Sequence, residues 1–160
     1  TDDGPEFVLV WQEDAATDRD IVITESDVKN LLRAKGAIYA GIRSLLKTVE
    51  LPEEAIERIY IAGGFGNYLN IKDAVEIGLL PDLPREKYVF IGNASVKGAR
   101  MALLSREALR GAEEVARKMT YLELSAGNMF MEEFTSAMFL PHTDLSLFPS
   151  VRGTAGGEGR

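Results

Sequence analysis

The stretch RIYIAGGFGN, residues 58–67, is the part of the sequence that decides the fold. A β-prone run at 59–62 stops on two glycines, and the apolar residues of 71–77 then follow a helical spacing. The same order returns at YVFIGN, residues 88–93, before an expected helix over 94–104. A strand, a glycine turn and a helix that occur twice indicate a parallel α/β sheet with a right-handed crossover.

The upstream segment predicts a strand pair and one long helix. Apolar runs at 7–11 and 20–23 are separated by a polar, turn-like segment and suit two adjacent strands. Thr24 and Asp27 then stand at the spacing of a helix capping box. The apolar residues that follow predict a helix over about 25–48.

The downstream segment predicts two helices and a further strand. Helices are expected over 106–118 and 128–139, and the alternating residues 120–124 predict a half-buried strand between them. We expect one domain over residues 1–150 and a glycine-rich, disordered tail over 151–160.

The composition excludes several classes of function. The chain has 160 residues, with 18 Lys and Arg against 25 Asp and Glu, and its net charge of -7 disfavours nucleic acid and anionic membranes as partners. It has no cysteine and one histidine, so it holds no disulfide, no thiolate zinc site and no cysteine-ligated iron–sulfur cluster. We expect no metal site within the chain. No run approaches the roughly 20 apolar residues of a membrane span.

The glycine turn is the candidate binding site. Glycine at the carboxyl end of a parallel strand lets a ligand approach the backbone, and the start of the next helix attracts phosphate or polar groups. A tight turn without a ligand explains Gly63 and Gly64 equally well. No Gly-Lys-Ser/Thr follows, so the turn is not a Walker A loop, and it lacks the triple-glycine dinucleotide fingerprint. Gly64 is expected to be the least replaceable position, with a positive φ.

Two other groups of small residues suggest close packing. Residues 92–99, GNASVKGA, crowd the start of a helix beside the same sheet edge, and packing against the glycine loop is favoured over ligand contact. A second group forms a thin face of the long helix and suits close helix packing; it consists of Gly36, Ala37, Ala40 and Gly41.

Charged residues offer weaker candidates. Arg33 and Lys35 flank the thin face, where a cation could reach a nucleotide base or phosphate, although solvated helix charges are commoner. Glu132 and Glu133 are neighbours on a helix, point about 100° apart and are expected to be solvated. His142 is expected to cap a turn or line an interface.

Residues 27–46, 59–67, 92–99 and 139–144 occur in an order that resembles the C-terminal part of the reductive activators of corrinoid proteins. The resemblance covers about residues 6–150 and includes the motifs LLRAKGAIYA and FLPHTD. These activators belong to the superfamily of acetate and sugar kinases, heat-shock 70 chaperones and actin. The resemblance implies an α/β fold, a ribonuclease-H-like half of an actin-like ATPase domain with a mixed sheet and flanking helices.

The resemblance also implies a function. Such activators couple ATP hydrolysis to the return of an inactive Co(II) corrinoid to Co(I), and they combine a [2Fe-2S] ferredoxin domain, a linker and a duplicated ATPase domain. Their adenosine motif would fall on the glycine turn, and the helix from 93 onward would connect the two halves. The candidate nucleotide-binding residues are then Gly63, Gly64, Phe65, Gly66, Asn67, Arg33, Lys35, Asn93 and Ser95.

Parts of the family pattern are missing from this chain. It lacks the Asp-x-Gly-Thr phosphate turn, the second phosphate loop and the cluster cysteines. We therefore expect the adenosine side of an ATP site without its phosphate and magnesium side, no catalytic residue, and no hydrolysis by the chain alone. ATP with Mg would bind to the complete protein, and the [2Fe-2S] cluster would lie in an N-terminal region.

The implied partners are a corrinoid iron–sulfur protein or another corrinoid protein, and the rest of the ATPase domain. A homodimer is an open alternative, and the expected location is cytoplasmic. Two other functions also stay open. One is an activator of a 2-hydroxyacyl-CoA dehydratase or a sugar-kinase-like ATP-binding protein, which share the adenosine motif. The other is a non-catalytic protein-docking module whose glycine turns are purely structural.

Overall fold

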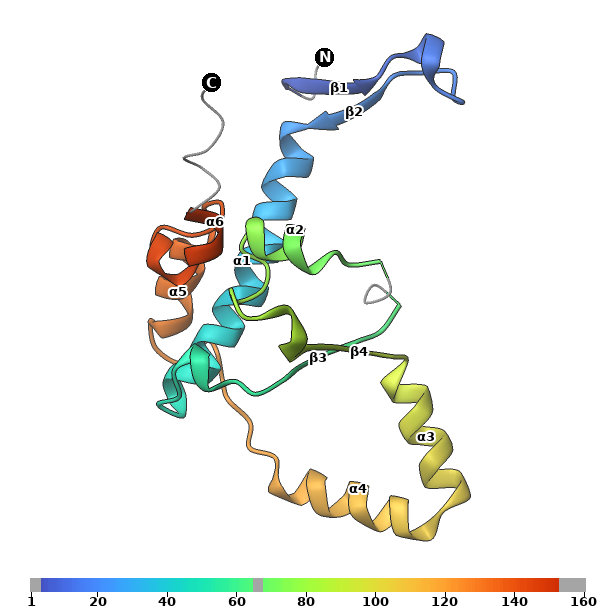
Figure 1. Ribbon diagram of the computed structural model, residues 1–160, viewed down its shortest axis with the longest axis vertical. Helices are drawn as coiled ribbons and strands as arrows, with labels where there is room; N and C mark the ends of the chain where they lie inside the picture. Colours follow the sequence, from blue (N-terminus) through green and yellow to red (C-terminus); the bar gives the residue numbers. More distant parts are fainter. Residues whose placement is uncertain (1–3, 65–67, 153–160) are drawn as a thin grey trace.

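The computed structural model describes residues 4–64 and 68–152 (Figure 1). The first element is an antiparallel pair of strands, β1 (Glu6–Val10) and β2 (Ile21–Thr24), with a bulge in β1. The long helix α1 (Glu25–Thr48) follows without a linker. Thr24 and Asp27 form the expected capping box, because each side chain accepts a hydrogen bond from the other residue's backbone N–H, at 3.1 and 2.9 Å. The predicted strand pair and long helix are confirmed.

The second strand pair carries the glycine turn. β3 (Ile59–Ala62) and β4 (Tyr88–Gly92) pair in parallel, and α2 (Ile71–Glu76) lies between them in the sequence. The predicted order of strand, turn and helix is confirmed. Among the described residues, the two strand pairs form separate two-stranded sheets rather than one mixed sheet.

Helices α3 (Ala94–Leu104) and α4 (Arg106–Lys118) form an arm that projects from the body (Figure 1). Both helices have the predicted bounds, but neither has a buried residue. A Cβ at Gly98 would meet nothing within 4 Å. Among the described residues, α3 makes its main contacts with α4. Residues 65–67 of the glycine loop lie outside the described residues, so packing of the start of α3 against that loop stays a prediction.

The last elements are α5 (Met129–Ala137) and α6 (Pro149–Arg152). The strand expected at 120–124 is wrong, since Glu123 accepts local hydrogen bonds from Tyr121 Oη at 2.6 Å and Ser125 N at 3.2 Å. α6 also contains residues 151 and 152, which the sequence assigned to the tail, and 153–160 lie outside the described residues. Single 3-10 turns lie at Gln12–Asp14, Glu53–Ala55, Arg85–Lys87 and Leu145–Leu147.

The core forms where α1 packs against α5 and the segments around α2. A Cβ at Gly36 would lie 3.3 Å from the carbonyl oxygen of Ala137, and Ala40 is buried, so this part of the thin face of α1 does serve close helix packing. The prediction is wrong for Ala37, which is exposed, and for Gly41, where a Cβ would meet no described atom within 4 Å. Burial is confined to this region; the buried apolar cluster consists of Tyr39, Ile71, Ala74, Val75, Leu80, Tyr88, Ala137 and Phe148.

The rest of the chain exposes much apolar surface. The whole chain, of 17.6 kDa, has an accessible surface of 12269 Å², whereas a compact monomer of this mass exposes about 7,900 Å². The excess includes the strand pair and the arm; large exposed side chains there are Phe7, Leu9, Trp11, Ile21, Ile23, Val96, Met101, Leu103, Leu104, Leu109 and Val115. Within the described ranges, every helix is too short or too polar to cross a bilayer.

Candidate functional site

The glycine turn lies at the carboxyl ends of the parallel strands. Gly63 N–H donates a hydrogen bond of 2.8 Å to the carbonyl oxygen of Gly92, so the ends of β3 and β4 meet at two glycines. Gly63 has φ +95° and Gly92 has φ +64°. The left-handed conformation expected at Gly64 lies at Gly63 instead. Among the described residues, no atom lies within 4 Å of a Cβ built on Gly63 or Gly64, so these residues leave the backbone accessible at this edge.

Apart from Lys35, the other candidate residues divide into three groups. Asn93 and Ser95 lie at the start of α3, beside the same edge; the Asn93 side chain caps the helix by accepting from Val96 N–H at 3.0 Å, and Ser95 is exposed. Arg33 is exposed on α1. The remaining candidates lie outside the described residues, namely Phe65, Gly66 and Asn67.

Lys97 is a cation at this edge that the sequence analysis missed. Its Nζ donates to the carbonyl oxygen of Ile91 at 2.7 Å, and a Cβ built on Gly92 would lie 3.7 Å from that Nζ. Helical side chains tilt toward the helix N-terminus, so a lysine one turn after the cap Asn93 can reach back to the strand end. The position of Lys97 four residues after Asn93 was the sequence signal that could have identified it.

Lys35 has a structural position. Its side chain is 1% exposed, and its ammonium donates to the carbonyl oxygens of Phe139 and, at 2.7 Å, Pro141. Burial lowers the pKa of Lys35 to about 8. The interpretation of Lys35 as a solvated charge is wrong, because its charge links α1 to the segment after α5.

Charged groups also join α1 to α5. Arg43 lies between two carboxylates, 3.0 Å from Glu53 and 3.2 Å from Glu133, and Lys47 also pairs with Glu133. Burial acts to raise the pKa of Glu133, but hydrogen bonds from Lys47 and Arg43 hold that pKa below its usual value. The expected solvation of Glu133 is wrong, since only 7% of the residue is exposed, whereas Glu132 is exposed as expected.

His142 caps a turn, as expected. Its Nδ1 accepts a hydrogen bond of 2.9 Å from Asp144 N–H, so the proton of the neutral ring sits on Nε2. The ring packs edge-on against Tyr39, with 5.5 Å between ring centroids. Burial lowers the pKa of His142, which suits a neutral, structural imidazole.

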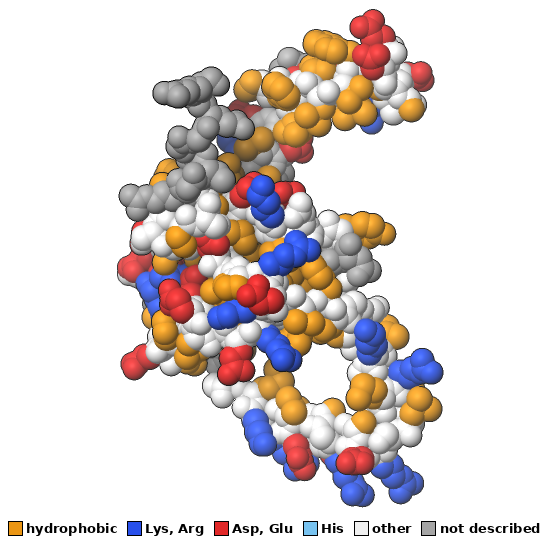
Figure 2. All heavy atoms as spheres, viewed as in Figure 1, with side chains coloured by type: hydrophobic (Ala, Val, Ile, Leu, Met, Phe, Trp, Pro, Cys, Tyr) orange, Lys and Arg blue, Asp and Glu red, His pale blue; other side chains and the backbone are white. Residues whose placement is uncertain are grey.

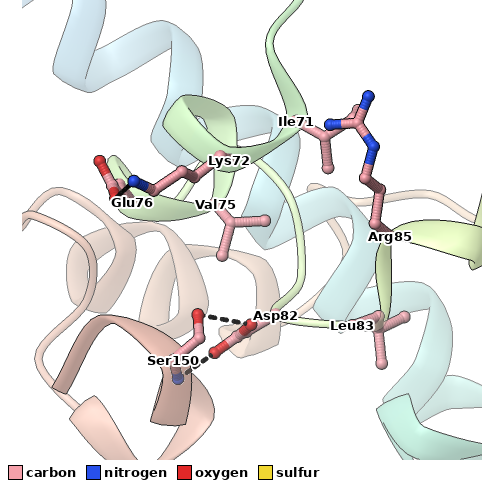
Figure 3. A pocket seen from close by; sticks show the side chains of 8 residues that line it. All are labelled: Ile71, Lys72, Val75, Glu76, Asp82, Leu83, Arg85 and Ser150. Atoms are coloured by element: carbon pink, nitrogen blue, oxygen red, sulfur yellow. Dashed lines mark hydrogen bonds and ion pairs between the residues drawn. The ribbon is translucent and has the colours of Figure 1, made fainter. Parts of the chain in front are cut away.

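A small cavity of about 260 Å³ lies beside α2 (Figure 3). Apolar side chains meet charged ones there; the lining residues are Ile71, Lys72, Val75, Glu76, Asp82, Leu83, Arg85 and Ser150. Ser150 donates to the Asp82 carboxylate through its N–H at 2.7 Å and its hydroxyl at 2.9 Å, and Lys72 pairs with Glu76 at 3.5 Å. Asp82, Lys72 and Glu76 thus have partners within the chain, and Arg85 is the remaining charged residue of the lining.

The described residues do not by themselves form a magnesium site, and the sequence has no ligand set for a cysteine-ligated iron–sulfur cluster. In the part that the structure describes, no three His, Cys, Asp or Glu side chains gather where they could hold a metal ion. The sequence has no cysteine for a cluster. What the site offers is backbone at a glycine-lined edge and one nearby cation.

Comparisons with known proteins agree on one family. Residues 1–152 match the family described as the C-terminal domain of RACo, the ASKHA domain. The chain is 35% identical over 128 residues to the corrinoid activation enzyme RamQ of Eubacterium limosum, covering 80% of this chain and 22% of that protein. It is also 35% identical over 100 residues to a [Co(II) methylated amine-specific corrinoid protein] reductase of Methanosarcina barkeri. That match covers 62% of this chain and 18% of the reductase.

A solved structure is also similar. It is named as a reductive activator for corrinoid, iron–sulfur protein, and it shares 62% identity and a TM-score of 0.85 over 94% of this chain. The match covers 24% of that structure's chain. The present chain therefore spans about a quarter or less of the length of each of these relatives.

Proposed function

The chain belongs to the family of C-terminal ASKHA domains of reductive activators of corrinoid proteins, and from this we propose that it forms the adenosine side of an ATP-dependent activator. The complete protein would return a corrinoid protein from Co(II) to Co(I) by delivering one electron from an external donor. The observation that supports this role of the chain is the accessible backbone at Gly63 and Gly64, where two parallel strands end.

The remaining parts of the ATP site would come from elsewhere in the protein. Phosphoryl transfer depends on groups that hold the γ-phosphate and its metal ion, and this chain has no cluster of metal ligands among its described residues. ATP with Mg would therefore bind between this part and the rest of the ATPase domain. The proposed [2Fe-2S] cluster would likewise lie outside this chain, which has no cysteine.

The exposed surface supports contact with the rest of the ATPase domain. Residues 94–118 carry six Lys or Arg against three Glu, although the whole chain has a net charge of -7. Figure 2 shows these basic side chains gathered over the arm, with apolar side chains between them. A surface that is both basic and apolar suits burial against an acidic protein surface.

A corrinoid protein is the proposed partner of the complete activator. The relatives are named as a corrinoid activation enzyme in Eubacterium and as a reductase of a corrinoid protein in Methanosarcina, and the solved structure is named as a reductive activator for corrinoid, iron–sulfur protein. The same names favour this function over activation of a 2-hydroxyacyl-CoA dehydratase. A homodimer and a cytoplasmic location stay in the proposal on the resemblance alone.

The test is reduction of a corrinoid protein by the complete activator. Absorption spectra would follow conversion of Co(II) to Co(I) with an electron donor, in the presence of ATP, ADP or no nucleotide. We expect reduction only with ATP. Reduction of equal rate and extent without nucleotide would refute the proposed role of ATP, and no reduction under any condition would refute the activator function.

A further inference from the structure

We propose that Lys97 binds a phosphate oxygen of the nucleotide that lies at Gly63 and Gly64. The inference rests on the proposed function and extends it to a residue outside the adenosine motif. It assigns to this chain a contact with the charged part of the nucleotide, although the family's phosphate loops are missing.

The position of the ammonium is fixed by the end of β4. Lys97 Nζ donates to the carbonyl oxygen of Ile91 at 2.7 Å and lies beside Gly92. Gly92 in turn accepts the N–H of Gly63 at 2.8 Å. Lys97, Gly92 and Gly63 are thus successive neighbours along one edge, which places a cation next to the accessible backbone.

The ammonium retains donors for a ligand. A lysine ammonium has three N–H groups, and the carbonyl of Ile91 uses one of them. No carboxylate in the described part of the chain lies within ion-pair distance of Lys97, whereas Lys29, Lys47 and Lys72 each pair with a glutamate. A positive charge at a glycine-lined edge without an acidic partner suits an anion.

The start of α3 favours negative charge as well. The helix has 11 residues, and its first turn contains no acidic side chain. The N-terminal end of a helix carries a partial positive charge that attracts phosphate. Lys97 and the end of α3 therefore favour the same kind of ligand group at the same edge.

The test compares nucleotides that differ in charge. In the complete protein, calorimetry would give the Kd of ATP, ADP and adenosine for the wild type, Lys97→Gln and Lys97→Arg. Lys72→Gln is the matched control, because Lys72 is an exposed helical lysine that pairs with Glu76. Circular dichroism and Tm would confirm that each variant folds.

We expect Lys97→Gln to weaken ATP and ADP binding by roughly tenfold, the effect of one charge-assisted hydrogen bond. Adenosine binding should not change, Lys97→Arg should largely restore affinity, and Lys72→Gln should have no effect. Equal weakening for adenosine would overturn the proposal, because Lys97 would then only shape the edge. If Lys97→Gln binds ATP, ADP and adenosine as tightly as the wild type does, the proposal is also overturned. If the wild type binds no nucleotide, the proposed function fails first, before any variant is compared.

Discussion

The ammonium of Lys35 donates a hydrogen bond of 2.7 Å to the carbonyl oxygen of Pro141, which lies 106 residues further along the chain. The carbonyl oxygen of Phe139 accepts from the same ammonium. This contact fixes the segment after α5 against α1, in the only region of the described chain with a developed core. Since burial lowers the pKa of Lys35 to about 8, the contact also makes stability depend on pH.

Lys35→Met should lower the free energy of unfolding at pH 7. Methionine fills the space but leaves the carbonyl oxygen of Pro141, which is buried, and that of Phe139, which is partly buried, without a donor; the two losses cost about 2–4 kcal/mol in total. Urea unfolding followed by circular dichroism would measure the difference. Lys29→Met is the control, because Lys29 lies on the same helix but is exposed and should matter by less than about 0.5 kcal/mol. Equal stability of Lys35→Met and wild type would contradict the structural role.

The same variant should change how stability varies between pH 8 and 10. The pKa of Lys35 falls from 10.5 to about 8 on folding, so in this interval the unfolded chain binds the extra proton. Stability of the wild type should therefore rise with pH relative to Lys35→Met, and the neutral amine still has N–H groups for the carbonyls. Urea unfolding at pH 7, 8, 9 and 10 would test this. Parallel curves for the two proteins would show that Lys35 keeps an ordinary pKa.

Glu133→Gln should destabilise the contact between α1 and α5. It removes the buried carboxylate that pairs with Arg43 and Lys47, and we expect a loss of about 2–4 kcal/mol at pH 7. The pKa of Glu133 is held below 4.5, so its stabilising effect is present above that pH and is lost as pH falls further. Glu132→Gln is a matched control on the exposed side of the helix. If both variants lose the same stability, or if the loss at Glu133 does not shrink at all as the pH is lowered below 4.5, the ion pairs are not its cause.

Local patterns predicted most of the secondary structure. α1, α3 and α4 begin and end at the predicted residues, because each has a capping residue and a strong helical pattern. The glycine turn was also correctly placed at a strand end. The strand at 120–124 was wrong, because alternation alone does not supply a partner strand, and Glu123 satisfies neighbouring donors within a turn.

Side-chain burial was harder to predict. Lys35 and Glu133 look like solvated helix charges in the sequence, but their partners lie 86 to 106 residues away and become visible only once α5 packs on α1. Lys97 was missed for a different reason. Residues 92–99 look like small packing residues in the sequence, while the helical turn brings the one long side chain among them back to the strand end.

Glycine substitutions should distinguish a position where packing and backbone conformation require glycine, Gly78, from one where neither does, Gly111. A Cβ at Gly78 would lie 2.1 Å from the carbonyl oxygen of Pro141, at φ +73°. Gly78→Ala should therefore cost about 3 kcal/mol or more, from the clash and the left-handed conformation together. Gly111→Ala, within α4 and with nothing within 4 Å of its Cβ, should stabilise the helix by about 0.5–1 kcal/mol. Thermal unfolding of the two variants should thus shift in opposite directions, and a shift in the same direction would contradict the backbone geometry.

Substitutions in the glycine turn should distinguish a requirement for folding, at Gly63, from a requirement for nucleotide binding, at Gly64. Gly63 has φ +95°, so Gly63→Ala should reduce stability by about 1–2 kcal/mol even without a ligand.

Gly64 has no positive φ, and a Cβ there meets no described atom within 4 Å, so Gly64→Val should change the Tm of the complete protein little. If adenosine lies against this backbone, however, the branched side chain occupies the ligand's place, and nucleotide affinity should fall at least tenfold. Gly153→Val, at a glycine that follows α6, is the control and should leave affinity unchanged. Loss of affinity without loss of folding at Gly64 identifies a ligand contact, since neither the backbone conformation nor packing against the described residues requires glycine there. Wild-type affinity in Gly64→Val would remove the adenosine assignment and leave the turn a purely structural feature.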